Sequence, residues 1–172
     1  MPTQPDNKNF LSPIGFQFAI QKLPHVTYFC TSATIPAVTM GQIETVETPF
    51  VRLPVPGDKL SYGDFSVRFR IDEDLKNYQE IYDWMVSLGY PDNFGQRAPN
   101  QRASNQPGET TYSDASLIIT TNQYKPNVNV KFIDLYPTSI SGVDFTVEET
   151  DVSYLLADVT FRYRKFELST VA

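Results

Sequence analysis

The side chains that most often carry chemistry are few in this chain. It has one histidine, His25, and one cysteine, Cys30, so zinc sites and hydrolytic triads lack their usual partners. His25 follows Pro24 in a predicted turn, where a solvated imidazole is the expected state. Cys30 follows Phe29 in an alternating pattern, where a free thiol packs as a small hydrophobe. Neither residue is predicted to be catalytic.

An acidic run, Asp72-Glu73-Asp74, suggests at first a metal site or an acid–base pair. The run directly precedes a helical pattern, and carboxylates at a helix start complement its free N–H groups and the positive end of its dipole. The structural interpretation is therefore favoured. Gly57 and Gly63 do not form a phosphate-binding loop, because no glycine-rich turn leads into a helix with a following lysine and hydroxyl residue. These residues predict no enzyme, no metal and no cofactor.

One basic row resembles a nucleic-acid surface. Its members face outward from two predicted strands, with aromatic side chains nearby: Arg68, Arg70, Arg162, Arg164 and Lys165. The chain has 14 basic and 20 acidic residues and a net charge of −6, which disfavours sequence-independent binding to phosphates. Pairing of the row with carboxylates on a neighbouring strand or subunit is the favoured interpretation.

Hydrophobic alternation with period two predicts mostly strands. The runs Phe16 to Gln21 and Val26 to Cys30 flank a turn at Leu23-Pro24-His25, so they are expected to pair as an antiparallel hairpin. Pro56-Gly57-Asp58 predicts a turn before the clearest strand. The inward residues of that strand are Phe65, Val67, Phe69 and Ile71. Further strands are expected over 116–121, 128–135, 144–149 and 152–166.

One amphipathic helix is expected from about Leu75 to Leu88, with Gly89 and Pro91 supplying its end. The hydrophobic spacing predicts that Tyr78, Tyr82 and Met85 pack against the strands, with Ile81 and Leu88 at the margins. Trp84 lies off this stripe, so the sequence leaves it open between the margin of the stripe and a subunit contact.

These elements form one domain of 172 residues, which is large enough to bury a good core. Strands at both ends around a single helix predict a mainly β chain, an antiparallel β-sandwich or barrel with one flanking α-helix. Residues 1–13 are expected to be a flexible N-terminal arm and 14–172 a single β domain with a polar surface loop near 92–114. No apolar run reaches the ~20 residues of a spanning helix, and the start lacks a signal sequence, so no membrane association is expected.

The stretch near 39–60 is threonine- and valine-rich and is broken by prolines, which predicts an extended edge hairpin or arm and not a central strand. It carries more apolar surface than a solvated segment should expose. We therefore expect it to contact something beyond its own domain. The candidate interface residues are Phe50, Val51, Leu53 and Val55, together with Trp84.

Several segments occur in an order that is hard to obtain by chance. They are Cys30-Thr31-Ser32-Ala33-Thr34-Ile35-Pro36, Gly57-Asp58-Lys59 before an alternating strand, Asp72-Glu73 before a helix bearing Asp83-Trp84, and Leu135-Tyr136-Pro137-Thr138 before the last strands. In this order, from about Ile14 to Glu167, the chain resembles the tail-tube proteins of contractile-tailed bacteriophages. The resemblance implies a sandwich of antiparallel sheets with a flanking helix. It also implies a six-fold ring whose strands join into one barrel around a channel, as in type VI secretion inner tubes.

The function implied by the resemblance is that of a virion structural protein, assembled in the host cytoplasm, whose stacked hexameric rings form the tail tube. Sheath subunits would surround the tube, baseplate or tail terminator proteins would lie at its ends, and DNA would pass through it during ejection. The long polar loop and the N-terminal arm depart from the family pattern, so a baseplate tube initiator or adaptor is the alternative. A monomeric ligand-binding sandwich, with Tyr112 and Tyr124 as an aromatic platform, is the hypothesis from another class.

Charge gives an expectation for the channel. Six copies at −6 each carry a formal charge of about −36, and carboxylates on the wall would repel phosphate and let DNA pass without specific binding. The lumen candidates are Asp144, Glu148 and Glu149 on a predicted late strand, and solvation on the outer surface suits these residues equally well.

Overall fold

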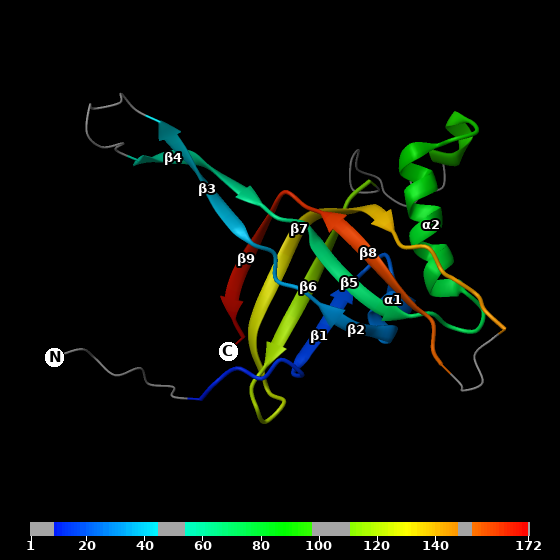
Figure 1. The fold of residues 1–172 in the computed structure, drawn as a ribbon, viewed down its shortest axis with the longest axis horizontal. Coiled ribbons are helices and arrows are strands. Elements are labelled where there is room, and N and C mark those ends of the chain that lie inside the picture. Colours follow the sequence, from blue (N-terminus) through cyan, green and yellow to red (C-terminus); the bar gives the residue numbers. More distant parts are fainter. Residues whose placement is uncertain (1–8, 45–53, 98–110, 148–152, 172) are drawn as a thin grey trace.

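The computed structural model describes residues 9–44, 54–97, 111–147 and 153–171 (Figure 1). Its elements, in chain order, are β1 (Phe16–Ile20), α1 (Pro24–Phe29), β2 (Cys30–Ala33), β3 (Val38–Glu44), β4 (Pro54–Tyr62), β5 (Phe65–Arg70), α2 (Lys76–Gly89), the 3-10 turn η1 (Phe94–Arg97), β6 (Ser113–Thr120), β7 (Pro126–Ile140), β8 (Leu156–Arg162) and β9 (Lys165–Thr170). In this part of the chain no helix has the length and apolar character needed to cross a membrane.

The long strand β7 belongs to two layers, and every strand pair is antiparallel. Residues 126–135 of β7 pair with β6 and β9, which gives layer A in the order β1-β6-β7-β9. Residues 136–140 pair with β8, which gives layer B in the order β7-β8-β5-β2. The chain is therefore mainly β, and the predicted antiparallel sandwich with a flanking helix is confirmed.

The core lies between the two layers and is largely aromatic. On β5, Phe65 is fully buried, and its ring centroid lies 4.2 Å from that of Phe132 on β7 and 5.6 Å from that of Phe18 on β1. Val67 and Phe69 are buried as well, while the alternate residues of β5 are exposed. The period-two prediction for this strand is confirmed, because one face of the strand packs against the other layer.

The predicted opening hairpin is wrong. Residues Pro24–Phe29 form the short helix α1, and Val26 is fully buried on it. β1 pairs instead with β6, and β2 pairs with β5. Pro24 occupies the first turn of the helix, where its fixed φ and missing N–H are tolerated. Burial of Val26 against the core outweighs the strand preference of the sequence Val-Thr-Tyr-Phe.

The helix prediction is confirmed in position, and its predicted face is right in part: Tyr78 and Met85 are partly buried and pack against the core, whereas Tyr82 does not. The four buried residues of α2 are Asn77, Ile81, Trp84 and Ser87, whereas Tyr82 is 55% exposed. Two of the four are polar and satisfied locally. Asn77 donates from Nδ2 to the carbonyl of Arg70 at 2.7 Å, and Ser87 donates from Oγ to the carbonyl of Trp84 at 2.6 Å. These hydrogen bonds offset the cost of burying the two polar side chains, so the buried face of α2 is centred on Ile81 and Trp84 and leaves Tyr82 outside it.

The carboxyl-terminal strands differ in detail from the prediction. The expected strand over 152–166 is two strands, because the chain turns at Tyr163-Arg164 and β9 returns along β7, where the N–H of Arg164 donates to the carbonyl of Ile133 at 3.0 Å. The predicted strands over 116–121 and 128–135 correspond to β6 and to part of β7. Residues 144–147 form no strand, which corrects that part of the prediction for 144–149.

Candidate assembly surfaces

The pair β3 and β4 forms a separate two-stranded hairpin, called the arm below, which projects from the sandwich (Figure 1). It covers the described part of the stretch predicted to be extended. The interface candidate Val55 pairs with Ile43 and is 39% exposed, whereas Phe50, Val51 and Leu53 lie outside the described residues. A two-stranded hairpin alone is marginally stable in water, so an arm of this kind needs a packing partner.

The segment Pro56-Gly57-Asp58 forms a bulge and not the predicted turn. These residues lie inside β4, opposite the register shift between Met40 and Gln42 of β3. A Cβ on Gly57 would lie 2.5 Å from the carbonyl oxygen of Gly41, so only glycine allows the two backbones to approach this closely.

Aromatic rings anchor the base of the arm. The ring of Tyr62, the last residue of β4, lies 5.6 Å from that of Phe166 and 6.0 Å from that of Tyr163. The hydroxyl of Tyr163 donates to the carbonyl of Gly63 at 2.9 Å, and burial raises the pKa of that hydroxyl to about 12. The N–H of Gly63 in turn donates to the carbonyl of Ala37 at 2.8 Å. The arm is therefore held at both of its connections to the sandwich.

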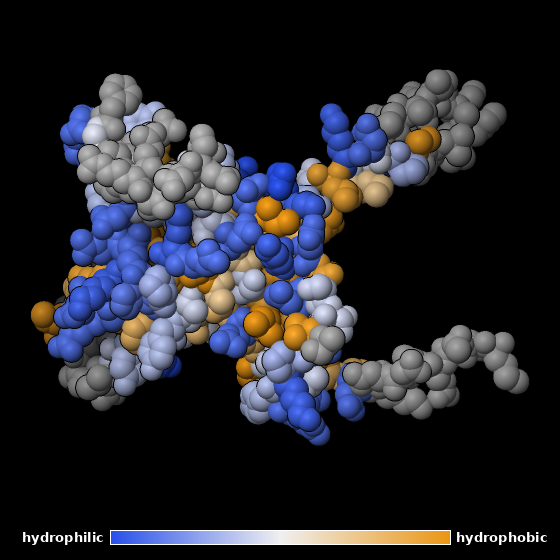
Figure 2. Space-filling model, turned by 180° about the vertical axis from the view of Figure 1, so that it is seen from behind, coloured by the Kyte–Doolittle hydropathy of each residue, from blue (hydrophilic) through white to orange (hydrophobic). Residues whose placement is uncertain are grey.

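Next to this anchor, on either side of the contact between Tyr62 and Phe166, lies a group of side chains that we call the apolar corner. Its members are Val38, Met40, Leu60 and Tyr62 on the arm and Phe166 and Leu168 on β9. Leu60 lies two residues before Tyr62 on β4, and Leu168 lies two residues after Phe166 on β9. Because side chains two residues apart on a strand point to the same side, Leu60 projects from the same face as Tyr62, and Leu168 projects from the same face as Phe166. Met40, Leu60 and Leu168 are 57%, 51% and 64% exposed. Figure 2 shows hydrophobic side chains gathered along the base of the arm.

Strand β1 presents an open edge at the other side of layer A. The N–H of Thr120 donates to the carbonyl of Gly15, so the backbone groups of the odd-numbered residues point to β6. Those of Phe16, Phe18 and Ile20 therefore point away from β6. The N–H of Ile20 is satisfied by the hydroxyl of Thr27 on α1, at 3.2 Å, which leaves the edge open beside Phe16 and Phe18.

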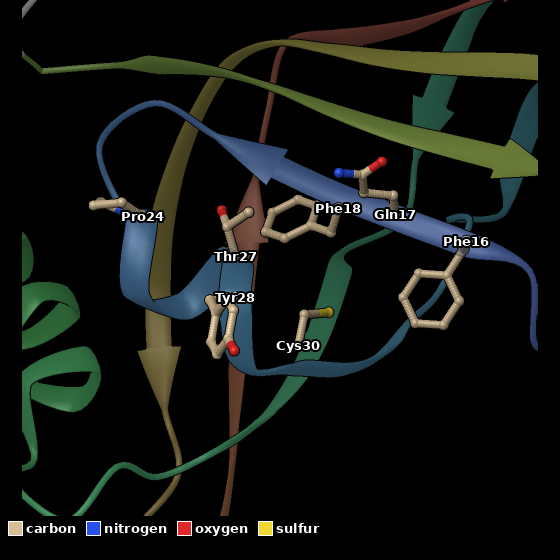
Figure 3. Close-up of a pocket in the computed structure, with 7 residues that line it drawn as sticks. All are labelled: Phe16, Gln17, Phe18, Pro24, Thr27, Tyr28 and Cys30. Carbon is tan, nitrogen blue, oxygen red and sulfur yellow. The ribbon is translucent and has the colours of Figure 1, made fainter. Parts of the chain in front are cut away.

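An open pocket of about 430 Å³ lies along this edge, between β1, α1 and the start of β2 (Figure 3). It is lined by Phe16, Gln17, Phe18, Pro24, Thr27, Tyr28 and Cys30. The lining combines polar and apolar surface in similar shares, and Tyr28, one of its residues, is 82% exposed. Burial raises the pKa of the Cys30 thiol to about 11, so the thiol is neutral and packs as a hydrophobe, as predicted.

The basic row is paired with carboxylates within the chain. Arg68 makes two hydrogen bonds to Asp158 on the next strand, at 2.8 and 3.0 Å. Two further guanidinium groups form ion pairs with aspartates: Arg162 lies 2.9 Å from Asp64, and Arg164 lies 2.8 Å from Asp134. Arg70 stands over the ring of Tyr154, 5.2 Å from its centroid. The favoured interpretation is confirmed for Arg68, Arg162 and Arg164, whereas Arg70 contacts an aromatic ring.

The remaining candidate residues are dispersed. His25 lies on α1 and not in a turn, and its Nδ1 contacts Oε1 of Glu80 on α2. Asp72 accepts a hydrogen bond from the N–H of Asn77 at 3.4 Å, which gives it the expected role near the helix start. In the described ranges no three histidine, cysteine or acidic side chains gather as metal ligands.

Trp84 lies in the core, 5% exposed, where its Nε1 donates to the carbonyl of Thr111 at 3.3 Å. It therefore offers almost no surface to a partner subunit. The lumen candidate Asp144 is exposed after the end of β7, and Glu148 and Glu149 lie outside the described residues. Sequence reasoning missed the pocket and the apolar corner, since both depend on which strands lie at the edges of layer A.

Comparison with known proteins supplies the family. A family model described as phage tail tube protein matches residues 3–169. The tail tube terminator protein of Enterobacteria phage T4 is 27% identical over 143 residues, which span 80% of this chain and 74% of that protein.

Two cryo-EM structures share the fold at 14% identity. A chain of the anti-feeding prophage tube terminating cap superposes with a TM-score of 0.65 over 98% of this chain and 97% of that one. A chain of the PVC sheath–tube complex, from an extracellular contractile injection system in its extended state, gives 0.63 over 95% and 94%. With the family model spanning nearly its whole length, the chain belongs to the phage tail tube protein family.

Proposed function

We propose that this chain is a structural subunit of a contractile phage tail, and that its copies associate head to tail into a six-fold ring that forms part of the tail tube. The observation that carries the proposal is the pair of open edges of layer A. Among the described residues, β1 has a strand neighbour only in β6, and β9 only in β7. Unpaired strand edges are templates for pairing with another chain.

The two edges suit one another in direction and length. Layer A has four antiparallel strands, so β9 of one copy and β1 of the next run antiparallel when all copies keep the same orientation. β1 has five residues and β9 has six. A contact between two different surfaces of identical copies closes into a ring when the rotation between copies allows it.

The ring would place the outer face of layer A on the channel, because layer B covers its other face. Two cross-strand rows form this outer face: Gln17, Ile118, Asn129 and Ser169, and Ala19, Ser116, Lys131 and Glu167. Lys131 lies 3.1 Å from Asp114, and Lys165 lies 2.5 Å from Glu167. Such a wall has balanced charges and releases few counterions, so DNA would pass without specific binding. In such a ring the exposed Asp144 would lie outside the channel.

The proposal is tested by the size of the purified protein in solution. Sedimentation velocity and native mass spectrometry should both give a discrete species of six copies, or stacks of it. A protein that stays monomeric up to the highest soluble concentration contradicts the ring and favours the ligand-binding sandwich.

A second candidate function is a terminator ring at the end of the tube. It is favoured by the 27% identity to the T4 tail tube terminator protein. Negative-stain micrographs separate the two roles, because a tube subunit should polymerise into long tubes whereas a terminator should stop at one or a few rings. A baseplate initiator or adaptor would also give short assemblies, and binding to purified baseplates instead of free tube ends would identify it. Sheath subunits are the expected partners around the tube.

A further inference from the structure

We propose that the pocket beside β1 receives Met40 and Leu60 from the arm of a neighbouring copy. This inference rests on the ring proposed above and adds a second contact to it, between side chains and not between strand edges. A second copy is the occupant because the chain carries both halves of the contact, on opposite edges of layer A.

The receiving half is the open pocket. Its lining includes Phe16 on β1, Pro24 and Tyr28 on α1 and Cys30 on β2, and in Figure 3 the sulfur of Cys30 points toward the side of Phe16, whereas the ring of Pro24 points away from the other residues. Most of the surface of Tyr28 is exposed to solvent. An apolar side chain that entered here would cover this surface and displace water from it.

The donating half is the part of the apolar corner that belongs to the arm. Met40 and Leu60 pair directly across β3 and β4, so their side chains stand together on one face of the hairpin. Both side chains are more than half exposed, although moving an apolar side chain out of water is favourable. Methionine also adapts its shape to irregular cavities.

The anchor at the base of the arm brings the two halves together. Because Tyr62 packs on Phe166, the arm leaves the sandwich beside the free edge of β9 (Figure 1). A strand added to that edge therefore lies under the arm. When that strand is β1 of the next copy, its Phe16 and Phe18 share the face of Leu168, and the pocket lies on the same face. The arm of one copy then stands over the pocket of the next.

Cys30 makes this arrangement directly testable, since it is the chain's one cysteine and its sulfur lines the pocket. In the variant Met40→Cys, each copy would carry one thiol on the arm and one in the pocket. Mild oxidation by a copper–phenanthroline catalyst under oxygen would join the two thiols across the subunit boundary, with two protons and two electrons passing to the oxidant. A disulfide requires Cα atoms about 4.4–6.8 Å apart, so it forms only where the thiols meet.

The expected result is a ladder of covalent oligomers on a non-reducing gel, because every copy links to the next. Tyr124→Cys is the matched control, since it places a thiol at a site that is also exposed (69%) but lies at the turn between β6 and β7. The yield of linked species should be at least about tenfold higher for Met40→Cys than for the control, because only its thiol meets the geometric requirement. Adding Cys30→Ser to Met40→Cys should abolish the ladder.

Leu60→Cys gives a second, independent crosslink in case Met40→Cys alters the arm. Rings that form normally with both variants but give no ladder with either overturn the inference and leave the ring in place. Absence of rings in the unmodified protein instead contradicts the proposed function itself.

Discussion

Replacing Tyr62 with alanine removes the anchor that holds the arm over the edge of β9. The ring of Tyr62 makes two aromatic contacts, with Phe166 at 5.6 Å and with Tyr163 at 6.0 Å. Pairs of this kind contribute about 0.5–1.5 kcal/mol each beyond the area that they bury, so the substitution should lower the free energy of unfolding by at least about 1–3 kcal/mol. The sandwich should stay folded, because Tyr163 still packs on Phe132 at 5.1 Å.

The effect on assembly should be much larger than the effect on stability. Without the anchor the arm no longer keeps one direction, and each subunit boundary of a ring loses the arm contact that supports the strand pairing. Urea unfolding under monomeric conditions measures the first quantity, and sedimentation velocity at assembling concentrations measures the second. Tyr124→Ala removes an exposed tyrosine far from the arm and serves as the control. Normal ring formation by Tyr62→Ala, with the stability loss as stated, would refute the reasoning.

Three further predictions follow from the same geometry. Ile81→Ala should cost about 2–5 kcal/mol of stability because Ile81 is fully buried, whereas Tyr82→Ala should stay within about 0.5 kcal/mol, and equal losses in urea unfolding would contradict the observed face of α2. Gly57→Ala should prevent assembly while leaving the melting of the sandwich unchanged, because its Cβ meets the carbonyl of Gly41, and circular dichroism with sedimentation checks both. Alkylation of Cys30 by iodoacetamide should stay slow until the pH approaches its raised pKa of about 11, and stability should fall as pH rises from 9 toward 11 because the unfolded chain loses this proton first. Rapid alkylation at neutral pH would show that the pKa of the thiol is not raised.

Local pattern predicted those elements whose burial follows a simple period. β5 alternates strictly between core and solvent, and the position of α2 follows from its hydrophobic spacing and its glycine end. The face of α2 could not be predicted this way, because Asn77 and Ser87 are buried with partners that lie on Arg70 and on the helix itself. A hydrophobic pattern treats polar residues as exposed, because it contains no information about their hydrogen-bond partners.

The assembly surfaces were predictable only in part. The prolines and apolar residues of the arm indicated an extended segment that needs a partner, and the arm is extended as expected. The pocket could not be predicted, because it requires α1 in place of a second strand and requires β1 to lie at an edge. The position of Pro24 at the start of α1 is a signal for the helix, but a proline is equally typical of a turn.

A cryo-EM map of the assembled protein, at a resolution that separates β-strands, tests the central claim most directly. In that map, layer A should continue from copy to copy through antiparallel pairing of β9 with the next β1, and the face bearing Asn129 and Lys131 should line the channel. A closed ring in which β1 and β9 remain unpaired, or in which layer B faces the channel, would contradict that claim.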